Sequence, residues 1–198
     1  MTNQELHNIL KPYTLEPLEE KHLAMVLEWR NSPRIHEKMY TNHLITMEEH
    51  INWFKRNKNR KDAQFLLAHY NGKPFGYIAI DPIDTENHRT CWKGFYIGAP
   101  EIAPRKSGLI LEYLTLEQIF QNHSIRKIHC EVLADNTKVE RLHESFGFHR
   151  EGLLENHIYK NEKYNSIILM ALFRHHWDSI KPKAEEMIIR TINNVQKS

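Results

Sequence analysis

The chain has 198 residues and a formal net charge of +2 at pH 7. This length suits one domain with a complete hydrophobic core, and the small net charge argues against a broad basic surface for DNA or RNA. Residues 1–20 are polar and lack the apolar stretch of a secretory signal, and no window approaches the ~20 apolar residues of a membrane span. We therefore expect a cytoplasmic protein that binds neither nucleic acid nor a membrane.

The first half of the chain alternates apolar runs with helical patterns. A strand is expected at 13–18 and a helix at 19–32, which Pro33 ends. A loop then leads to Thr46 and Glu49, whose spacing is that of a capping box and predicts the start of a second helix. These elements place the region between the two predicted helices in a long loop.

The clearest local signal is Asn71-Gly72, which joins two apolar runs and predicts a β-hairpin. The patterns that follow predict a strand, a helix, a strand, a helix and a second hairpin, at 89–98, 107–120, 125–134, 135–148 and 150–173. An apolar period at 174–198 predicts a helical extension beyond a domain that spans 1–173. Mixed strands with interleaved helices predict an α/β or α+β sandwich around one sheet, and we favour an α/β fold in which helices flank one mixed sheet.

The two cysteines, Cys91 and Cys130, have neither the spacing of a zinc motif nor that of a disulfide framework. His175 and His176 are adjacent, but the sequence positions no third ligand beside them. We therefore predict two buried thiols in a reducing compartment and no metal site.

A basic cluster stands where the helix at 107–120 is expected to begin. The helix dipole disfavours cations at this end, so Arg105 and Lys106 suggest that an anion binds there. Unpaired N–H groups and a glycine at a helix start are well suited to a pyrophosphate. Such a cradle would use Arg105, Lys106, Ser107, Gly108, Leu109 and Ile110. A surface loop with solvated cations is the alternative that this stretch leaves open, since Walker and dinucleotide motifs are absent.

A second segment, CEVLADNTKVERLHESFGFHREG at 130–152, resembles the second half of the GCN5-related N-acetyltransferase (GNAT) family. The signature of that family's first half, Arg/Gln-x-x-Gly-x-Gly/Ala, is matched in RKSGLI by Arg105 and Gly108, whereas Ile110 replaces the small final residue. The likeness covers roughly residues 13–173 and includes the order of elements. It implies a GNAT fold and acetyl-CoA as cofactor.

The resemblance also implies which residues hold the cofactor and which act on it. The backbone of Phe95, Tyr96 and Ile97 would pair with the pantetheine arm, and Asn136 would bond to the same region. Glu131 matches a general base, and His143 stands where the family usually has a tyrosine acid. Two alternatives remain open, a solvent-facing or arginine-paired Glu131 and a His143 with only a packing role.

The segment WRN, followed by MY and EEH, resembles one subgroup of the family, the sugar-nucleotide N-acetyltransferases of pseudaminic acid biosynthesis. That likeness implies a small-molecule acceptor, the 4-amino group of a UDP-linked amino-deoxy sugar. Cations would serve its nucleotide end and an apolar wall its methyl-bearing ring. Arg30 and His50 are expected at the nucleotide end. The residues expected to form the apolar wall are Met39, Tyr40, Phe54 and Tyr96.

Other functions are compatible with the sequence. The chain could be a protein N-terminal acetyltransferase, like those that modify ribosomal proteins, or a detoxifying amine acetyltransferase. A non-catalytic GNAT-like module that binds CoA or serves as a scaffold is a further alternative, because Ile110 and His143 depart from the family pattern. A structural salt bridge is the alternative role for Arg30, and the extension at 174–198 is compatible with a homodimer.

Overall fold

The computed structural model describes residues 2–122 and 124–196, and a seven-stranded sheet runs through it. Its strands are β1 (Tyr13–Pro17), β2 (Gln64–Tyr70), β3 (Lys73–Asp84), β4 (Arg89–Ile97), β5 (Lys127–Leu133), β6 (His149–Lys160) and β7 (Lys163–Phe173). They lie in the order β1-β2-β3-β4-β5-β7-β6, and β4 and β5 form the parallel pair of an otherwise antiparallel sheet.

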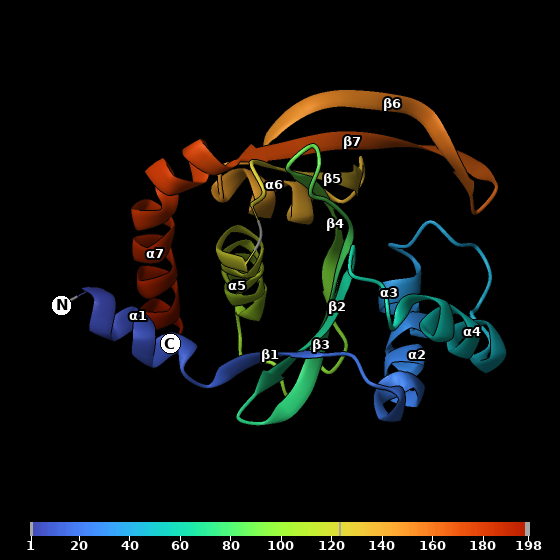
Figure 1. Cartoon of the computed structure of the whole chain (residues 1–198), viewed down its shortest axis with the longest axis horizontal. Coiled ribbons are helices and arrows are strands. Elements are labelled where there is room, and N and C mark those ends of the chain that lie inside the picture. Colours follow the sequence, from blue (N-terminus) through green and yellow to red (C-terminus); the bar gives the residue numbers. More distant parts are fainter. Residues whose placement is uncertain (1, 123, 197–198) are drawn as a thin grey trace.

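The helices cover both faces of this sheet. They are α1 (Thr2–Leu10), α2 (Leu23–Asn31), α3 (Pro33–His36), α4 (Met47–Asn57), α5 (Ser107–Asn122), α6 (Thr137–Ser145) and α7 (Arg174–Gln196), with a short 3-10 turn, η1 (Glu20–His22). Figure 1 shows α5, α6 and α7 on one side of the sheet and α2, α3 and α4 on the other. This arrangement confirms the predicted fold class. None of the described helices is long and apolar enough to cross a bilayer.

Several local predictions are confirmed in detail. Thr46 Oγ1 accepts from the Glu49 N–H at 3.2 Å, and Glu49 Oε2 accepts from the Thr46 N–H at 2.7 Å, so the capping box starts α4. Asn71 and Gly72 have φ angles of 48° and 74°, as a tight hairpin turn between β2 and β3 requires. Gly147 ends α6 with a φ of 87°.

One helix in the first forty residues was not predicted, and one expectation there is wrong. The chain begins with α1, whose Leu6 is buried and whose partner is α7, so a short polar segment gains its helix from tertiary packing. Pro33 ends α2 but also begins α3, because proline is favoured at the first helical position. The expected loop therefore starts with a further turn of helix.

The C-terminal extension is built into the main core. Trp177 and Ile188 of α7 are buried in the same hydrophobic cluster as Ile110 and Leu116 of α5. Tyr113 Oη donates to Glu185 Oε1 at 2.7 Å, which adds a polar link between the two helices. The helix predicted at 174–198 is observed over Arg174–Gln196 and packs against the domain, and residues 197–198 of that prediction lie outside the described residues.

Candidate active site

The feature that positions the site is a gap between β4 and β5. The two strands pair only at Arg89–Cys91 with Lys127–His129, and beyond this point they separate. Gly94 lies in the left-handed region with a φ of 94°, next to a register irregularity between β3 and β4. From Phe95 to Ile97, β4 pairs with β3 on one side while its other edge faces the gap. The gap therefore offers backbone groups to an extended ligand.

The predicted pantetheine residues lie along this gap. Phe95, Tyr96 and Ile97 are all half-buried. The carbonyl oxygen of Ile97 already accepts from Arg34 Nη2 at 2.7 Å, so the last of the three is partly engaged by α3. Asn136 is the N-cap residue of α6, yet its side chain makes no capping hydrogen bond. Its amide group is therefore available to a ligand.

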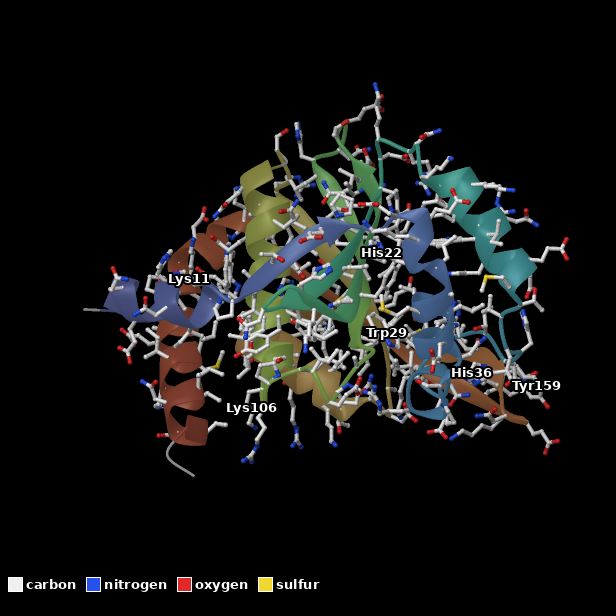
Figure 2. All side chains as sticks on the ribbon, turned by 90° about the horizontal axis from the view of Figure 1, so that it is seen from below. Lys11, His22, Trp29, His36, Lys106 and Tyr159 are labelled. Atoms are coloured by element: carbon white, nitrogen blue, oxygen red, sulfur yellow. The ribbon has the colours of Figure 1, made fainter. Side chains whose placement is uncertain are left out.

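The predicted pyrophosphate cradle would use the backbone N–H groups of residues 107–110, and two of these four already have partners in the structure. The Ser107 N–H donates to the Pro104 carbonyl at 3.1 Å, and the Leu109 N–H donates to the Lys106 carbonyl at 2.9 Å. Lys106 has a φ of 71°, a strained left-handed conformation that turns the chain into the helix. Figure 2 shows Lys106 at the outer edge of the molecule, where α5 begins.

The remaining residues of this loop divide between surface and core. Arg105 is exposed like Lys106, whereas Ser107 and Ile110 are buried, and Ile110 fills core space where the family has a small residue. A Cβ added to Gly108 would meet nothing nearer than Leu142 Cδ2 at 4.0 Å. The backbone at Gly108 is therefore open to a ligand, flanked by two exposed cations.

On the other side of the gap, the structure joins two predicted residues from distant parts of the chain. Tyr40 Oη donates to Glu131 Oε2 at 3.0 Å, although one lies between α3 and α4 and the other on β5. Among the described residues, Glu131 Oε1 receives no hydrogen bond, so this oxygen remains free to accept a proton. Burial and the carboxylate of Glu131 raise the pKa of Tyr40, which keeps its phenol protonated.

A second set of predicted site residues lies near Arg30. Arg30 Nη2 donates to Thr41 Oγ1 at 2.5 Å, while the buried Nη1 has no partner among the described residues. His50 is 8% exposed, stacks on Trp53 at 5.5 Å, and leaves its buried Nε2 unpaired. Burial and the positive charge of Arg30 both lower the pKa of His50, so the imidazole is neutral at pH 7. Two buried nitrogen atoms, one on Arg30 and one on His50, therefore lack the hydrogen-bond partner that buried polar atoms normally have.

Aromatic and apolar residues surround this polar group. Tyr96 stacks on Tyr77 with ring centroids 5.2 Å apart, and the charge of Arg30 acts on both phenols. Met39 packs against the core, and Phe54 of α4 is 8% exposed within it. The structure thus brings Arg30, His50 and Tyr96 together, while Phe54 serves mainly as core.

The predicted acid, His143, is buried on the opposite face of the sheet from Glu131. It is 3% exposed, its Nδ1 lies 2.7 Å from Oε1 of the fully buried Glu112, and its ring packs on Trp92. Burial disfavours the charged imidazole, but the Glu112 carboxylate outweighs this effect and raises the pKa of His143 to about 10. The pair joins α6 to α5, and a role for His143 as acid stays a prediction.

A thiol also lies near the gap. Cys91 is buried on β4, and the charge of Glu131 reaches it. Burial, opposed in part by Lys93, raises the pKa of Cys91 to about 11. The group is therefore a thiol at neutral pH and a poor nucleophile, which favours direct transfer over a covalent cysteine intermediate.

Comparison with known proteins identifies the family. A family model described as the acetyltransferase (GNAT) domain matches residues 13–149. The chain belongs to the GNAT acetyltransferase family. It is therefore an N-acetyltransferase that uses acetyl-CoA, and the predictions of enzyme class and cofactor are confirmed.

Individual relatives of this acetyltransferase are distant. Acetyltransferase PseH of Campylobacter jejuni is 26% identical over 139 residues, which cover 70% of this chain and 83% of that protein. An uncharacterized protein of Methanocaldococcus jannaschii is 25% identical over 138 residues, but the match spans only 27% of its length. A crystal structure of spermidine N-acetyltransferase from Vibrio cholerae, in complex with CoA and spermine, superposes with a TM-score of 0.78. That likeness has 20% identity, covers 84% of this chain and 98% of that chain, and shows the fold alone.

The residues present fit acetyl-CoA. The gap exposes one edge of β4, the side chain of Asn136 at the start of α6 is uncommitted, and the backbone at Gly108 at the start of α5 is open. Together they offer hydrogen-bonding groups for an amide-bearing arm and positive charge for a diphosphate.

Three residues of the acetyltransferase site were not predicted from the sequence. Tyr77 lies under Tyr96, Thr41 receives the hydrogen bond of Arg30, and Lys160 contacts the backbone between α3 and α4. The alternation of β3 could have placed Tyr77 on the face it shares with its β4 neighbour. No local pattern distinguishes Thr41 or Lys160, because their roles depend on contacts between distant segments.

Proposed function

We propose that this acetyltransferase acetylates the amine of an anionic small molecule, namely the 4-amino group of a UDP-linked amino-deoxy sugar of the kind used in pseudaminic acid biosynthesis. The observation that carries the proposal is the Arg30 group. Arg30 has no carboxylate partner in the part of the chain that the structure describes, and both Arg30 Nη1 and His50 Nε2 are buried and unpaired. A phosphate oxygen would satisfy both atoms.

A cationic acceptor suits this group poorly. A polyamine brought against Arg30 would meet like charge in a partly buried place, where repulsion is weakly screened. Lys160 is a second cation near this group, since the charge of Arg30 contributes to lowering the pKa of Lys160, after burial. The spermidine acetyltransferases therefore share the fold, while the charges near Arg30 favour an anionic acceptor. The 26% identity to acetyltransferase PseH agrees with the sequence resemblance from which this acceptor is proposed.

The chemistry follows from the gap and the Glu131 pair. Acetyl-CoA supplies an activated acetyl thioester, and the open edge of β4 holds and orients the arm that carries it. The acceptor ammonium must lose a proton before the amine can attack. Glu131 Oε1 accepts this proton, directly or through a water, while the hydrogen bond from Tyr40 orients Oε2. As the amine attacks, the amide C–N bond forms and the thioester C–S bond breaks, and a second proton of the amine passes to the sulfur of the departing CoA. Cys91 remains a thiol and takes no part in the transfer.

The test is a comparison of acceptors. Release of free CoA thiol is followed with UDP-4-amino-4,6-dideoxy-N-acetyl-β-L-altrosamine, with the same amino sugar lacking UDP, with spermidine and with a peptide amine. We expect the UDP-linked amine to have the highest kcat/KM, and removal of UDP to cost on the order of 10- to 100-fold, as lost charge-assisted hydrogen bonds should. A preference for spermidine or the peptide would overturn the proposal.

A variant then locates the nucleotide end. Arg30→Ala should raise the KM for the UDP-linked acceptor about tenfold or more and leave the KM for acetyl-CoA within about twofold. Arg56→Ala, an exposed arginine on α4, is the matched control and should change neither constant. Equal effects of Arg30→Ala on both substrates would place Arg30 outside the acceptor site.

A further inference from the structure

The end of β6 carries a lysine in an unusual environment. Lys160 is 4% exposed, and no carboxylate in the described part of the chain lies within ion-pair distance of its Nζ. Its ammonium instead donates to the carbonyl oxygens of His36 at 2.7 Å, Glu37 at 3.3 Å and Met39 at 2.5 Å. Burying a lysine ammonium without a counter-ion costs free energy, and hydrogen bonds to the three carbonyls offset that cost. Lys160 and the backbone that carries these carbonyls are therefore tied to each other.

The carbonyls that Lys160 holds belong to the turn at 36–40, which connects α3 to the segment before α4. Figure 1 shows the tip of the β6–β7 hairpin above this segment, and Figure 2 shows Tyr159, the neighbour of Lys160, beside His36. The strand end thus reaches across to a turn more than 120 residues away in the chain. Lys160 is the buried anchor of this contact.

The same turn delivers Tyr40 to Glu131. Tyr40 directly follows Met39, whose carbonyl accepts from Lys160, and its hydroxyl lies 3.0 Å from Glu131 Oε2. A second link, between Lys38 and Asp135, is 3.6 Å long and exposed, so it constrains the turn only weakly. Met39 also packs against the core, and Arg30 donates to Thr41, the residue after Tyr40. Lys160 adds three hydrogen bonds to the backbone of the turn from a distant element, so Tyr40 is held in part through β6.

We infer that Lys160 is a positioning residue for acetyl transfer. It fastens the turn at 36–40 so that Tyr40 keeps the Glu131 carboxylate oriented, with Oε1 directed to the acceptor amine. The inference rests on the proposed role of Glu131 as base, but not on the identity of the acceptor. Lys160 acts through Tyr40, touches no reacting atom, and should influence turnover more than binding of acetyl-CoA.

The kinetic test uses Lys160→Met, which keeps most of the side-chain volume and removes the donors. Its control is Lys163→Met, because Lys163 pairs with Lys160 across the hairpin and is exposed. With the best amine acceptor found, Lys160→Met should lower kcat about tenfold or more and change the KM for acetyl-CoA by less than about twofold, whereas Lys163→Met should alter neither beyond about twofold.

A double-mutant cycle separates positioning from general destabilisation. If Lys160 acts through Tyr40, adding Lys160→Met to Tyr40→Phe should cost less than about threefold in kcat, far less than in the wild-type background. Multiplicative losses would overturn the inference. Should Lys160→Met not fold, Lys160→Arg keeps a cation but displaces its donors, and the same cycle with this variant must show the same non-additivity.

A measurement without an acceptor separates this inference from the proposed function. Hydrogen exchange of the segment 36–43 should be at least about tenfold faster in Lys160→Met and unchanged in Lys163→Met. Unchanged exchange in Lys160→Met would refute the anchoring role even if the UDP-linked sugar proves to be the acceptor. Faster exchange with no turnover of that sugar would refute the acceptor and leave the anchor intact.

Discussion

The pair formed by Glu112 and His143 gives the sharpest stability prediction. Both side chains are almost fully buried. Burial lowers the pKa of His143, but the Glu112 carboxylate and, to a smaller extent, Cys130 outweigh it and raise this pKa from 6.5 to about 10. At about 1.4 kcal/mol per pKa unit, this rise corresponds to several kcal/mol at neutral pH, and breaking a buried ion pair costs about 3–5 kcal/mol. Glu112→Gln keeps the shape and one hydrogen-bond acceptor but removes the charge, so we expect a loss of about 3 kcal/mol at pH 7.

The pH dependence of this loss follows from the direction of the pKa change. Because the pKa of His143 is higher in the folded state, the contribution of the pair is complete below pH 6.5 and disappears as the pH rises through about 10. The difference in unfolding free energy between wild type and Glu112→Gln should therefore be largest at pH 6–7 and shrink towards pH 10.5.

The assay is urea denaturation at several pH values, followed by tryptophan fluorescence, since Trp92 and Trp177 are each 1% exposed. Glu151→Gln serves as the control, because Glu151 pairs with Lys127 at 2.7 Å in a partly exposed place and should cost less than about 1 kcal/mol. A loss below about 1 kcal/mol for Glu112→Gln, or a difference that is constant from pH 7 to pH 10.5, would refute the assignment of a charged buried pair.

Three further predictions concern the base, the packing beside β4 and the start of α4. Glu131→Gln should slow acetyl transfer at neutral pH about 100-fold, the usual contribution of a general base, while calorimetry shows an unchanged affinity for acetyl-CoA; an unchanged rate would remove Glu131 from the mechanism. Gly98→Ala should destabilise the fold by about 1–3 kcal/mol in a urea titration, since its Cβ would lie 1.9 Å from Trp29 Cδ2. Gly108→Ala is the control: its Cβ meets nothing nearer than 4.0 Å, so its unfolding free energy should lie within about 1 kcal/mol of wild type. Thr46→Ala should cost about 1 kcal/mol by removing the cap, and a thermal melt that does not move would contradict that assignment.

The sequence was a good guide wherever neighbouring residues decide the structure. The Asn71-Gly72 turn and the Thr46–Glu49 capping box depend on atoms a few residues apart, so their spacing predicts them directly. The family likeness extended this success to the order of elements and to the cofactor. The sequence did not predict α1. A segment this short and polar is stable as a helix only through tertiary packing, here the burial of Leu6 and the contact of α1 with α7.

The candidate site was predicted as a set of residues but not as an arrangement. Glu131 was expected as the base and His143 as the acid of one acetyl transfer. In the structure Glu131 is exposed on β5, whereas His143 is buried and paired with Glu112. Arg30 had a structural salt bridge as its alternative role, and in the structure it is half-buried with one nitrogen unpaired. Burial depends on every element that packs around a residue, and a single sequence does not specify it.

By itself, then, the sequence determined the strands, most of the helices and their turns, because these follow from periodicity and short-range hydrogen bonds. The family came from the resemblance of two motifs. Only the tertiary structure decided that Tyr40 rests on Glu131, 91 residues away, and that Lys160 supports the turn from which Tyr40 extends. Such contacts form when loops from separate elements meet over the end of a sheet. Their geometry is set by the packing of the whole domain and leaves no pattern in the local order of residues.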